Sequence, residues 1–307
     1  MPLSLRRGAV TRVVDDLHCE VDGVATVVYP RVTGAVEVGD EVVVNVQARE
    51  LGLGSGGFDV VYANLTRGLG LEVEEHAHVM VLPYTPLQHA VRHVEEDDPL
   101  AESLDGMPVV CCSLHSQVAP VCAALAGLRV AYVQVAGGAL PLELSDTVRA
   151  LRERGLVELA VAAGPCVGAV QAVNVYSALA WCKARGADVA VCALGPGIVG
   201  TGTSLGHGGV SAAQAVNAAA ALGGRPVLAP RVSGGDARAR HRGLSHHTET
   251  VLQLCLEEPL VPERAADNWR AACDGLPLAH MERGPDDDPE FFAWAFAAGA
   301  LARDLVA

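Results

Sequence analysis

The sequence predicts an α/β fold, in which a doubly wound, mostly parallel sheet domain follows a small all-β, barrel-like domain. Short β-rich segments separated by turn signals occupy residues 6–82, whereas from Met107 onward strand-like apolar runs alternate with helix-like runs. The first pattern is typical of barrels and sandwiches, and the second of parallel sheets. Half of the residues are apolar, which is enough for a sizeable core. We expect a barrel-like domain at 1–85, a connecting segment at 86–106, the parallel domain with the site at 107–260 and accessory helices at 261–307.

The N-terminal strands are predicted from β-branched residues and from the turns between them. Asp22-Gly23, Gly39-Asp40 and Ser55-Gly56-Gly57 are the turn signals. The expected β-rich segments are GAVTRVV at 8–14, EVDGVATVVYP at 20–30, DEVVVNVQA at 40–48 and GFDVVYANL at 57–65.

The second domain is predicted from short apolar runs with helical intervals. Strands are expected at 109–113, 129–135, 158–163, 188–194 and 226–232, with helices that include 145–154 and 211–222. In a parallel sheet all the carboxyl ends lie at one edge, and ligands bind beyond that edge. The segments expected there are 114–117, 136–145, 164–169, the glycine-rich loop 194–210 and the polar segment 231–248.

A long C-terminal helix is predicted to begin with Asp288 as N-cap and Pro289 in its first turn. Its aromatic residues are expected to pack on the sheet domain, and a face for self-association, giving a homo-oligomer, is the alternative. These residues are Phe291, Phe292, Trp294 and Phe296.

Charge and composition argue against several functions. The formal net charge of −14 argues against nucleic acid as a partner. Lys183 is the only lysine and no G-K-[ST] occurs, which argues against a Walker-type phosphate site and against Schiff-base chemistry. Nine cysteines without a C-x-x-C pair, and a start without an apolar signal core, predict a cytoplasmic protein. The uncharged run 159–182 contains Gly164-Pro165, so we expect a strand, a loop and a helix there and no membrane span.

The glycine-rich loop 194–210 is the most informative segment. It holds seven glycines, and Gly195, Gly197 and Gly200 have the spacing G-x-G-x-x-G after a predicted strand. Glycine amides can turn inward on an anion, and the following helix would add its positive end. The alternative is a loop that needs positive φ angles at several positions.

The polar segment 231–248 is the second candidate. Arg231 and Arg238 could hold phosphate or carboxylate, while Ser245 could cap a helix that starts near His247. A histidine at such a helix start tends to stay neutral, as a general base requires. His115, just after the first strand, is a further acid–base candidate. The alternative is a solvated arginine loop with one capping histidine.

Metal binding is a weaker prediction, because no H-E-x-x-H occurs. His76 and His78 lie two apart on an expected strand, and His89 and His93 lie four apart on an expected helix. A separate metal site could be built from His115, His241, His246 and His247.

Six short runs together resemble the bacterial family called domain of unknown function 3866. This resemblance covers most of the chain and implies no settled activity, substrate or cofactor. The loop after the third strand in that family is similar to G-H-x-F-G-G-D, whereas this chain has GPCVGAV at 164–170. The departures at Pro165, Ala169 and Val170 remove a histidine and an aspartate that a family reaction could use. The six runs are YTPLQ at 84–88, LHS at 114–116, GGALPLELSDTV at 137–148, AVNVYSAL at 172–179, GPGIVGTGT at 195–203 and RHRGLSHHT at 240–248.

The predicted function is an enzyme that hydrolyses, or transfers a group from, a small anionic ligand that is phosphorylated or nucleotide-like. A metabolite-binding or regulatory protein, a histidine-based metal-dependent hydrolase and a structural oligomer component are the alternatives. A covalent nucleophile, Thr203 or Ser204, is less favoured, because no nucleophile elbow and no ordered triad can be read from the sequence. The expected ligand donors are Gly195, Gly197, Gly200, Thr201, Gly202, Thr203, Ser204, Arg231 and Arg238, and the expected proton-transfer residues are His115, His246 and His247, oriented by Asp236.

Overall fold

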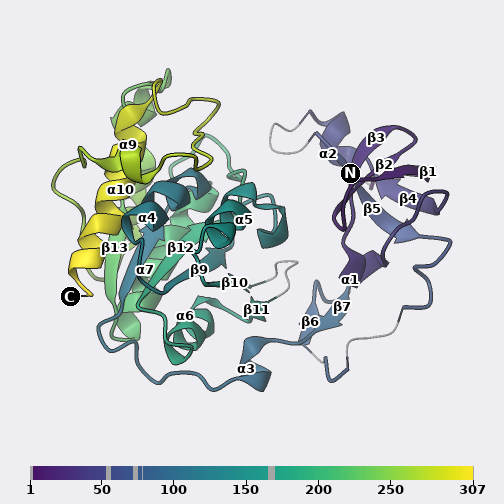
Figure 1. Ribbon diagram of the computed structural model, residues 1–307, viewed down its shortest axis with the longest axis horizontal. Coiled ribbons are helices and arrows are strands. Elements are labelled where there is room, and N and C mark those ends of the chain that lie inside the picture. The colour runs from purple at the N-terminus through teal and green to yellow at the C-terminus, as the bar shows by residue number, and fades with distance from the viewer. Residues whose placement is uncertain (1–2, 53–56, 72–74, 78, 165–169, 307) are drawn as a thin grey trace. The chain divides into compact units, whose positions relative to one another are not determined.

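The computed structural model describes residues 3–52, 57–71, 75–77, 79–164 and 170–306. The chain forms two compact units, Met1–Val91 and Arg92–Ala307, which are labelled by element in Figure 1. Within the described ranges, no helix combines the length and the apolar character needed to cross a bilayer.

The N-terminal unit contains a closed barrel with the strand order β1-β2-β3-β5-β4, so the barrel prediction is confirmed. The turn at Asp22-Gly23 has φ values of 50° and 78°, which the tight hairpin between β2 and β3 requires. A separate two-stranded ribbon, β6-β7, follows. The elements are β1 (Leu5–Val13), β2 (His18–Val21), β3 (Val24–Val27), α1 (Pro30–Thr33), β4 (Glu41–Asn45), α2 (Gln47–Glu50), β5 (Asp59–Asn64), β6 (Val79–Val81) and β7 (His89–Val91).

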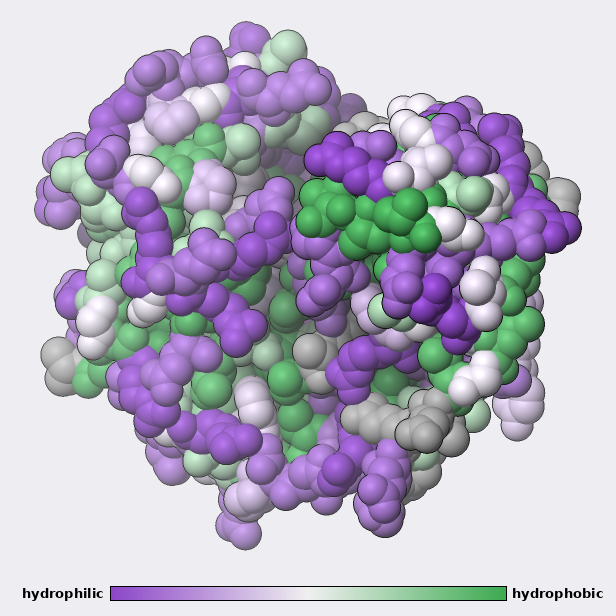
Figure 2. All heavy atoms as spheres, turned by 45° about the vertical axis from the view of Figure 1, so that its right-hand side comes forward, coloured by the Kyte–Doolittle hydropathy of each residue, from purple (hydrophilic) through white to green (hydrophobic). Residues whose placement is uncertain are grey.

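The barrel has its own small core of valines with one cysteine, from Val10 to Val61. Other apolar side chains of this unit, such as Val14, Val38 and Leu51, are more than half exposed. On the face drawn in Figure 2, both apolar and polar side chains are exposed. Exposed apolar side chains are common on folded proteins, so this distribution identifies no interface.

The second unit is built on a six-stranded sheet in which every pairing is parallel, in the order β11-β10-β9-β12-β8-β13. All five predicted strands are present, although the last ends earlier, at Ala229. The edge strand β11 was not predicted. A short antiparallel pair, β14-β15, follows β13. The strands are β8 (Pro108–Cys112), β9 (Val130–Val135), β10 (Leu159–Ala163), β11 (Gln171–Ala172), β12 (Val189–Leu194), β13 (Arg225–Ala229), β14 (Val232–Ser233) and β15 (Gly243–Leu244).

Helices occupy the intervals between these strands, as predicted. The uncharged run 159–182 divides into β10, β11 and a helix, which agrees with the sequence interpretation. The α-helices are α3 (Val94–Asp97), α4 (Val118–Ala124), α5 (Asp146–Glu153), α6 (Val175–Ala184), α7 (Ser211–Ala221), α8 (His246–Leu254), α9 (Trp269–Ala272) and α10 (Pro289–Asp304), and the 3-10 turns are η1 (His115–Gln117), η2 (Leu142–Leu144), η3 (Gly208–Val210) and η4 (Ala239–His241).

Alternate residues of each central strand enter two different core clusters. In β8, Val110 and Cys112 pack in a cluster with α4, α5, α9 and α10, while Val109 and Cys111 pack in one with α6 and α7. Because successive side chains of a strand point to opposite faces, helices cover both faces of the sheet. Phe291, Phe292 and Phe296 of α10 are buried in the first cluster, which confirms that they pack on the sheet domain.

Candidate functional site

The carboxyl edge of the sheet brings together the two segments that the sequence singled out. The glycine-rich loop follows β12 and the polar segment 231–248 follows β13. They meet where the ring of His207, near the end of the loop, stacks on His247 of α8, with centroids 3.7 Å apart and planes at 13°. Two segments that are separate in the sequence are therefore neighbours in the fold.

Four imidazole rings, those of His207, His241, His246 and His247, form what we call the histidine cluster. The ring centroids of His246 and His247 are 4.5 Å apart, and His241 lies 4.8 Å from each of them. Burial lowers the pKa of His247 to about 2 and that of His241 to about 3, and it also lowers the pKa values of His207 and His246. The four rings are therefore neutral at pH 7.

Several nitrogen atoms of this cluster lack partners. His207 is 7% exposed, and the Ser204 backbone carbonyl favours its protonated form. Among the described residues, however, neither ring nitrogen of His207 makes a hydrogen bond of normal geometry, and nor does Nε2 of His246. By contrast, Nδ1 of His241 is 2.7 Å from the Ser245 hydroxyl. Unpaired buried nitrogens are unfavourable and are often reserved for a ligand.

A buried guanidinium adjoins the cluster. The Arg231 side chain is 3% exposed, it donates to Nδ1 of His247 at 3.2 Å, and it pairs with Asp236 at 3.2 Å. An arginine can only donate, so Nδ1 of His247 is unprotonated and Nε2 carries the proton in the neutral ring. Burial lowers the pKa of Arg231 to about 10. Its Nε atom has no partner within the described part of the chain.

Asp236 is held by three arginines. Arg238 and Arg283 contact it at 2.8 Å and 3.3 Å in addition to Arg231, and the hydrogen bond from Arg238 is the main cause that holds the pKa of Asp236 well below its usual range. Arg283 also pairs with Asp288 at 3.2 Å. Three guanidinium groups against two carboxylates leave one surplus positive charge beside the neutral histidines, which suits an anionic ligand.

His115 occupies a different environment at the same edge. It is 8% exposed, and its Nδ1–H donates to the Leu194 carbonyl at 3.0 Å. Its Nε2 therefore accepts from the Ser145 hydroxyl, 2.8 Å away, and Ser145 in turn caps α5 through the amide of Val148. Burial lowers the pKa of His115 to about 4. Both ring nitrogens are engaged, and the residue joins the end of β12 to the start of α5.

Some glycines of the loop pack backbone against backbone. A Cβ on Gly195 would lie 2.2 Å from the Leu140 carbonyl oxygen, and one on Gly208 would lie 2.0 Å from that of Gly137. The loop after β9 is joined to the glycine-rich loop by backbone hydrogen bonds, such as Ala139 to Gly197 at 2.7 Å. Close approach of two loops thus explains part of the glycine content. A Cβ on Gly202, by contrast, would meet no heavy atom of the described chain within 4 Å.

The threonine hydroxyls act within the loop. Thr201 donates to the Gly206 carbonyl at 3.1 Å, and Thr203 accepts from the Gly206 amide at 3.0 Å. The chain turns back here, and the helix α7 begins only at Ser211. The direct passage from strand through glycines to helix, which G-x-G-x-x-G signifies in dinucleotide-binding folds, is therefore not formed.

The predicted caps have two outcomes. Ser245 accepts from the His247 amide and caps α8, as predicted. Asp288 stands at the N-cap position of α10, followed by Pro289, but its carboxylate makes no capping bond. It accepts instead from the Ser233 hydroxyl at 2.5 Å and from the Gly234 amide at 3.1 Å. Asp288 thereby joins the start of α10 to the polar segment. The sequence did not predict this role of Asp288, nor the roles of His207 and Arg283.

The other histidines proposed as metal ligands do not form a common site. His89 lies in β7 and His93 precedes α3 as its N-cap, so the two do not share a helix as expected. His76 is in a turn with φ of 62° rather than in a strand, and His78 lies outside the described residues. In the ranges that the structure describes, the one group of three metal-ligating side chains within mutual reach is His207, His246 and His247.

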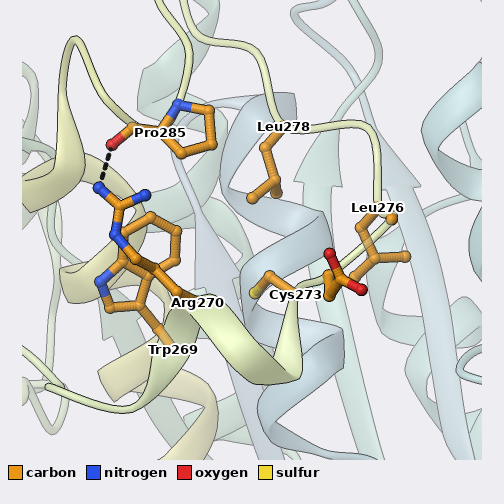
Figure 3. A pocket seen from close by; sticks show the side chains of 8 residues that line it. Trp269, Arg270, Cys273, Leu276, Leu278 and Pro285 are labelled. Carbon is orange, nitrogen blue, oxygen red and sulfur yellow. Dashed lines mark hydrogen bonds between the residues drawn. The ribbon is translucent and has the colours of Figure 1, made fainter.

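A cavity of about 330 Å³ lies elsewhere, beside α9 (Figure 3). The Arg270 guanidinium stacks over the Trp269 ring and donates to the Pro285 carbonyl at 2.8 Å, the dashed line in the figure. The lining of this cavity includes none of the site residues predicted from the sequence. The remaining lining residues are Cys273, Asp274, Gly275, Leu276 and Leu278.

Comparison with known proteins gives one match. Residues 25–271 match the family model described as "Protein of unknown function (DUF3866)". No curated protein and no solved structure matches the chain. The positions Pro165 and Ala169, where the loop departs from the expected family pattern, lie outside the described residues, and Val170 is a partly exposed bend residue. Since the match spans most of the sequence, the chain belongs to the DUF3866 family.

Proposed function

We propose that this protein is an enzyme that binds a small anionic ligand, phosphorylated or nucleotide-like, and hydrolyses it or transfers a group from it. The proposal treats the six-stranded unit as a doubly wound sheet, whose ligands bind beyond the carboxyl ends of the strands. The observation that carries it is the buried guanidinium of Arg231, with an unpartnered Nε, beside histidine nitrogens that also lack partners in the described chain.

The charge and the free donors of this edge support an anionic ligand. Three arginines face two aspartates, so the ion pairs at this edge leave one positive charge that an anion can neutralise. The amides of Gly197, Gly200 and Gly202 donate to no acceptor in the described part of the chain. They could supply backbone donors to the same ligand.

We assign proton transfer to His246 rather than to His115. Nε2 of His246 is free of partners among the described residues, whereas both nitrogens of His115 are hydrogen-bonded. Burial favours the neutral form of His246, which can accept a proton from an attacking water or hydroxyl. Asp236 does not contact His246 and acts here by holding Arg231, which in turn holds His247.

A non-catalytic metabolite-binding protein is the second candidate. It is favoured by the threonine hydroxyls, because Thr201 and Thr203 are engaged inside the loop and offer no evident nucleophile. The two candidates share the pocket and differ in whether the histidines carry out chemistry.

The first test is thermal unfolding of the whole chain with inorganic phosphate, nucleotides and small carboxylates. A ligand present at 100 times its Kd adds about 2.7 kcal/mol to the stability. Gly200→Leu, whose side chain would meet His207, should remove the effect. Gly70→Leu, at a glycine of the N-terminal unit where an added Cβ meets no heavy atom of the described chain within 4 Å, should keep it. A stabilising anion that is indifferent to Gly200→Leu would place the ligand elsewhere.

Turnover separates the two candidates once a ligand is known. An enzyme should lose about 100-fold or more in kcat when His246 and His247 are both changed to Ala. A binding protein has no turnover to lose. Failure of every anion to stabilise the protein would overturn the proposal.

A further inference from the structure

The part of the histidine cluster formed by His207, His246 and His247 has an arrangement that anion binding alone does not require. One ring nitrogen from each residue lies within 4.8 Å of the other two. His207 lies in the loop after β12, whereas His246 and His247 are the first two residues of α8, whose N-cap is Ser245. We propose that these residues form a binding site for one divalent transition-metal ion of the zinc type.

The free nitrogens are the independent observation. His207 is 7% exposed, and among the described residues neither of its ring nitrogens has a normal hydrogen-bond partner; the same holds for Nε2 of His246. Imidazole nitrogens left unpaired in a buried position lose hydrogen bonds that water would provide. A metal ion would bind one nitrogen of each residue and so offset part of that cost.

Whether His247 can act as the third metal ligand depends on Arg231. Nδ1 of His247 accepts a hydrogen bond from Arg231, so the neutral ring carries its proton on Nε2. A metal-bound ring must offer a lone pair to the ion, and its other nitrogen then carries the proton. His247 can therefore join His207 and His246 only when Arg231 releases it. The released guanidinium would remain beside the ion, with Asp236 offsetting its charge.

The donor set selects the class of metal. Three neutral imidazoles without a carboxylate or thiolate favour Zn²⁺ or Co²⁺ over Mg²⁺ and Ca²⁺, which prefer oxygen ligands. Three protein ligands also leave a coordination position open, as catalytic zinc sites do. A metal there would supply a Lewis acid beside the proposed anion site. It would also occupy the free nitrogen of His246, which would then not accept a proton while the ion is bound. The metal proposal rests on the histidines alone.

The experiment is a titration of chelator-treated, full-length protein with Co²⁺, followed by its visible absorption, and with Zn²⁺ by calorimetry. We expect one equivalent of either ion to bind, with Mg²⁺ producing no signal. His246→Ala and His207→Asn should each weaken binding by about tenfold or more, a change of about 1.4 kcal/mol. His89→Ala in β7 is the matched control and should leave the affinity unchanged.

Thermal unfolding of each metal-free variant shows whether it is folded, so that loss of binding is not confused with loss of structure. Stoichiometric binding that survives both His207→Asn and His246→Ala would overturn the proposal, and so would the absence of Co²⁺ or Zn²⁺ binding by folded wild-type protein. No anionic ligand is present in these titrations. A negative result therefore leaves the anion-binding proposal standing, and a positive one does not establish it.

Discussion

His115 and His207 are both buried at the carboxyl edge of the parallel sheet, and burial lowers the pKa of each. They differ in what their nitrogens contact. His115 donates to Leu194 and accepts from Ser145, whereas no described residue makes a normal hydrogen bond to the ring of His207. A buried imidazole whose bonds are satisfied supports the fold, and one that lacks them is available to a ligand. Burial and a lowered pKa alone do not distinguish the two roles.

The largest stability effect should come from the carboxylate that neutralises the buried arginine. Asp236→Ala leaves Arg231 buried without its main counter-charge, and we expect it to cost about 3–5 kcal/mol in urea unfolding. Asp286→Ala is the control, because Asp286 pairs with Arg270 while 94% exposed. That variant should lose no more than about 1 kcal/mol. Equal effects of the two variants would show that burial of Arg231 carries no special cost.

His115→Ala should destabilise the protein by about 2–4 kcal/mol, because it leaves the Leu194 carbonyl unpaired, frees the Ser145 hydroxyl and opens a cavity. His246→Ala, which removes no hydrogen bond of its Nε2, should cost about 1 kcal/mol or less. Thermal unfolding of both variants measures the contrast directly. Equal destabilisation of the two variants would contradict the different roles given to His115 and His246.

Gly195 and Gly202 of the glycine-rich loop allow a comparison of the same kind, between a residue that packs in the fold and one that leaves space. Gly195→Ala pushes a methyl group to 2.2 Å from the Leu140 carbonyl oxygen, so we expect a loss of about 1–3 kcal/mol. The methyl group of Gly202→Ala meets no heavy atom of the described chain within 4 Å, so this variant should be close to neutral. Urea unfolding of the two variants distinguishes a packing glycine from one that leaves room for a ligand. A neutral Gly195→Ala would contradict the packing role.

The last comparison concerns pH. The pKa of His115 is about 4 in the folded state, below its ordinary value of 6.5. As the pH falls, His115 therefore binds a proton first in the unfolded chain. Its contribution to stability is complete above pH 6.5 and is lost as the pH falls toward 4. The loss due to this residue is about 1.4 kcal/mol per pH unit within that window. In His115→Gln, the free energy of unfolding measured in urea should decline less steeply between pH 6.5 and 4. An unchanged slope would refute the assignment of this pH dependence to His115.

Much of the fold of the second unit was predictable, because its central strands are buried on both faces and their sequences are continuous apolar runs such as VAVCAL at 189–194. The edge strand β11 was missed because two residues, Gln171 and Ala172, carry no periodic signal. His89 and His93 were wrongly placed on one helix, since their spacing fits a helix although the chain forms a strand and then a cap.

The site was predictable only in part. The topology of a parallel sheet places the segments after β12 and β13 at one edge, and this principle selected Arg231, Asp236, His246 and His247 from the sequence. The stacking of His207 on His247 joins residues that are distant along the chain, so no local pattern indicates it. The hydrogen bonds that satisfy His115 come from Leu194 and Ser145, and they too depend on the folded chain.

The measurement that tests the central claim most directly is a histidine ring nitrogen NMR spectrum of the ¹⁵N-histidine-labelled protein, before and after one equivalent of Zn²⁺. The account predicts that ring signals of His207, His246 and His247, assigned by single substitutions, shift together while the signals of His115 remain in place. A response of His115 or His89, or a spectrum that Zn²⁺ leaves unchanged, would contradict the claim that His207, His246 and His247 form the ligand site.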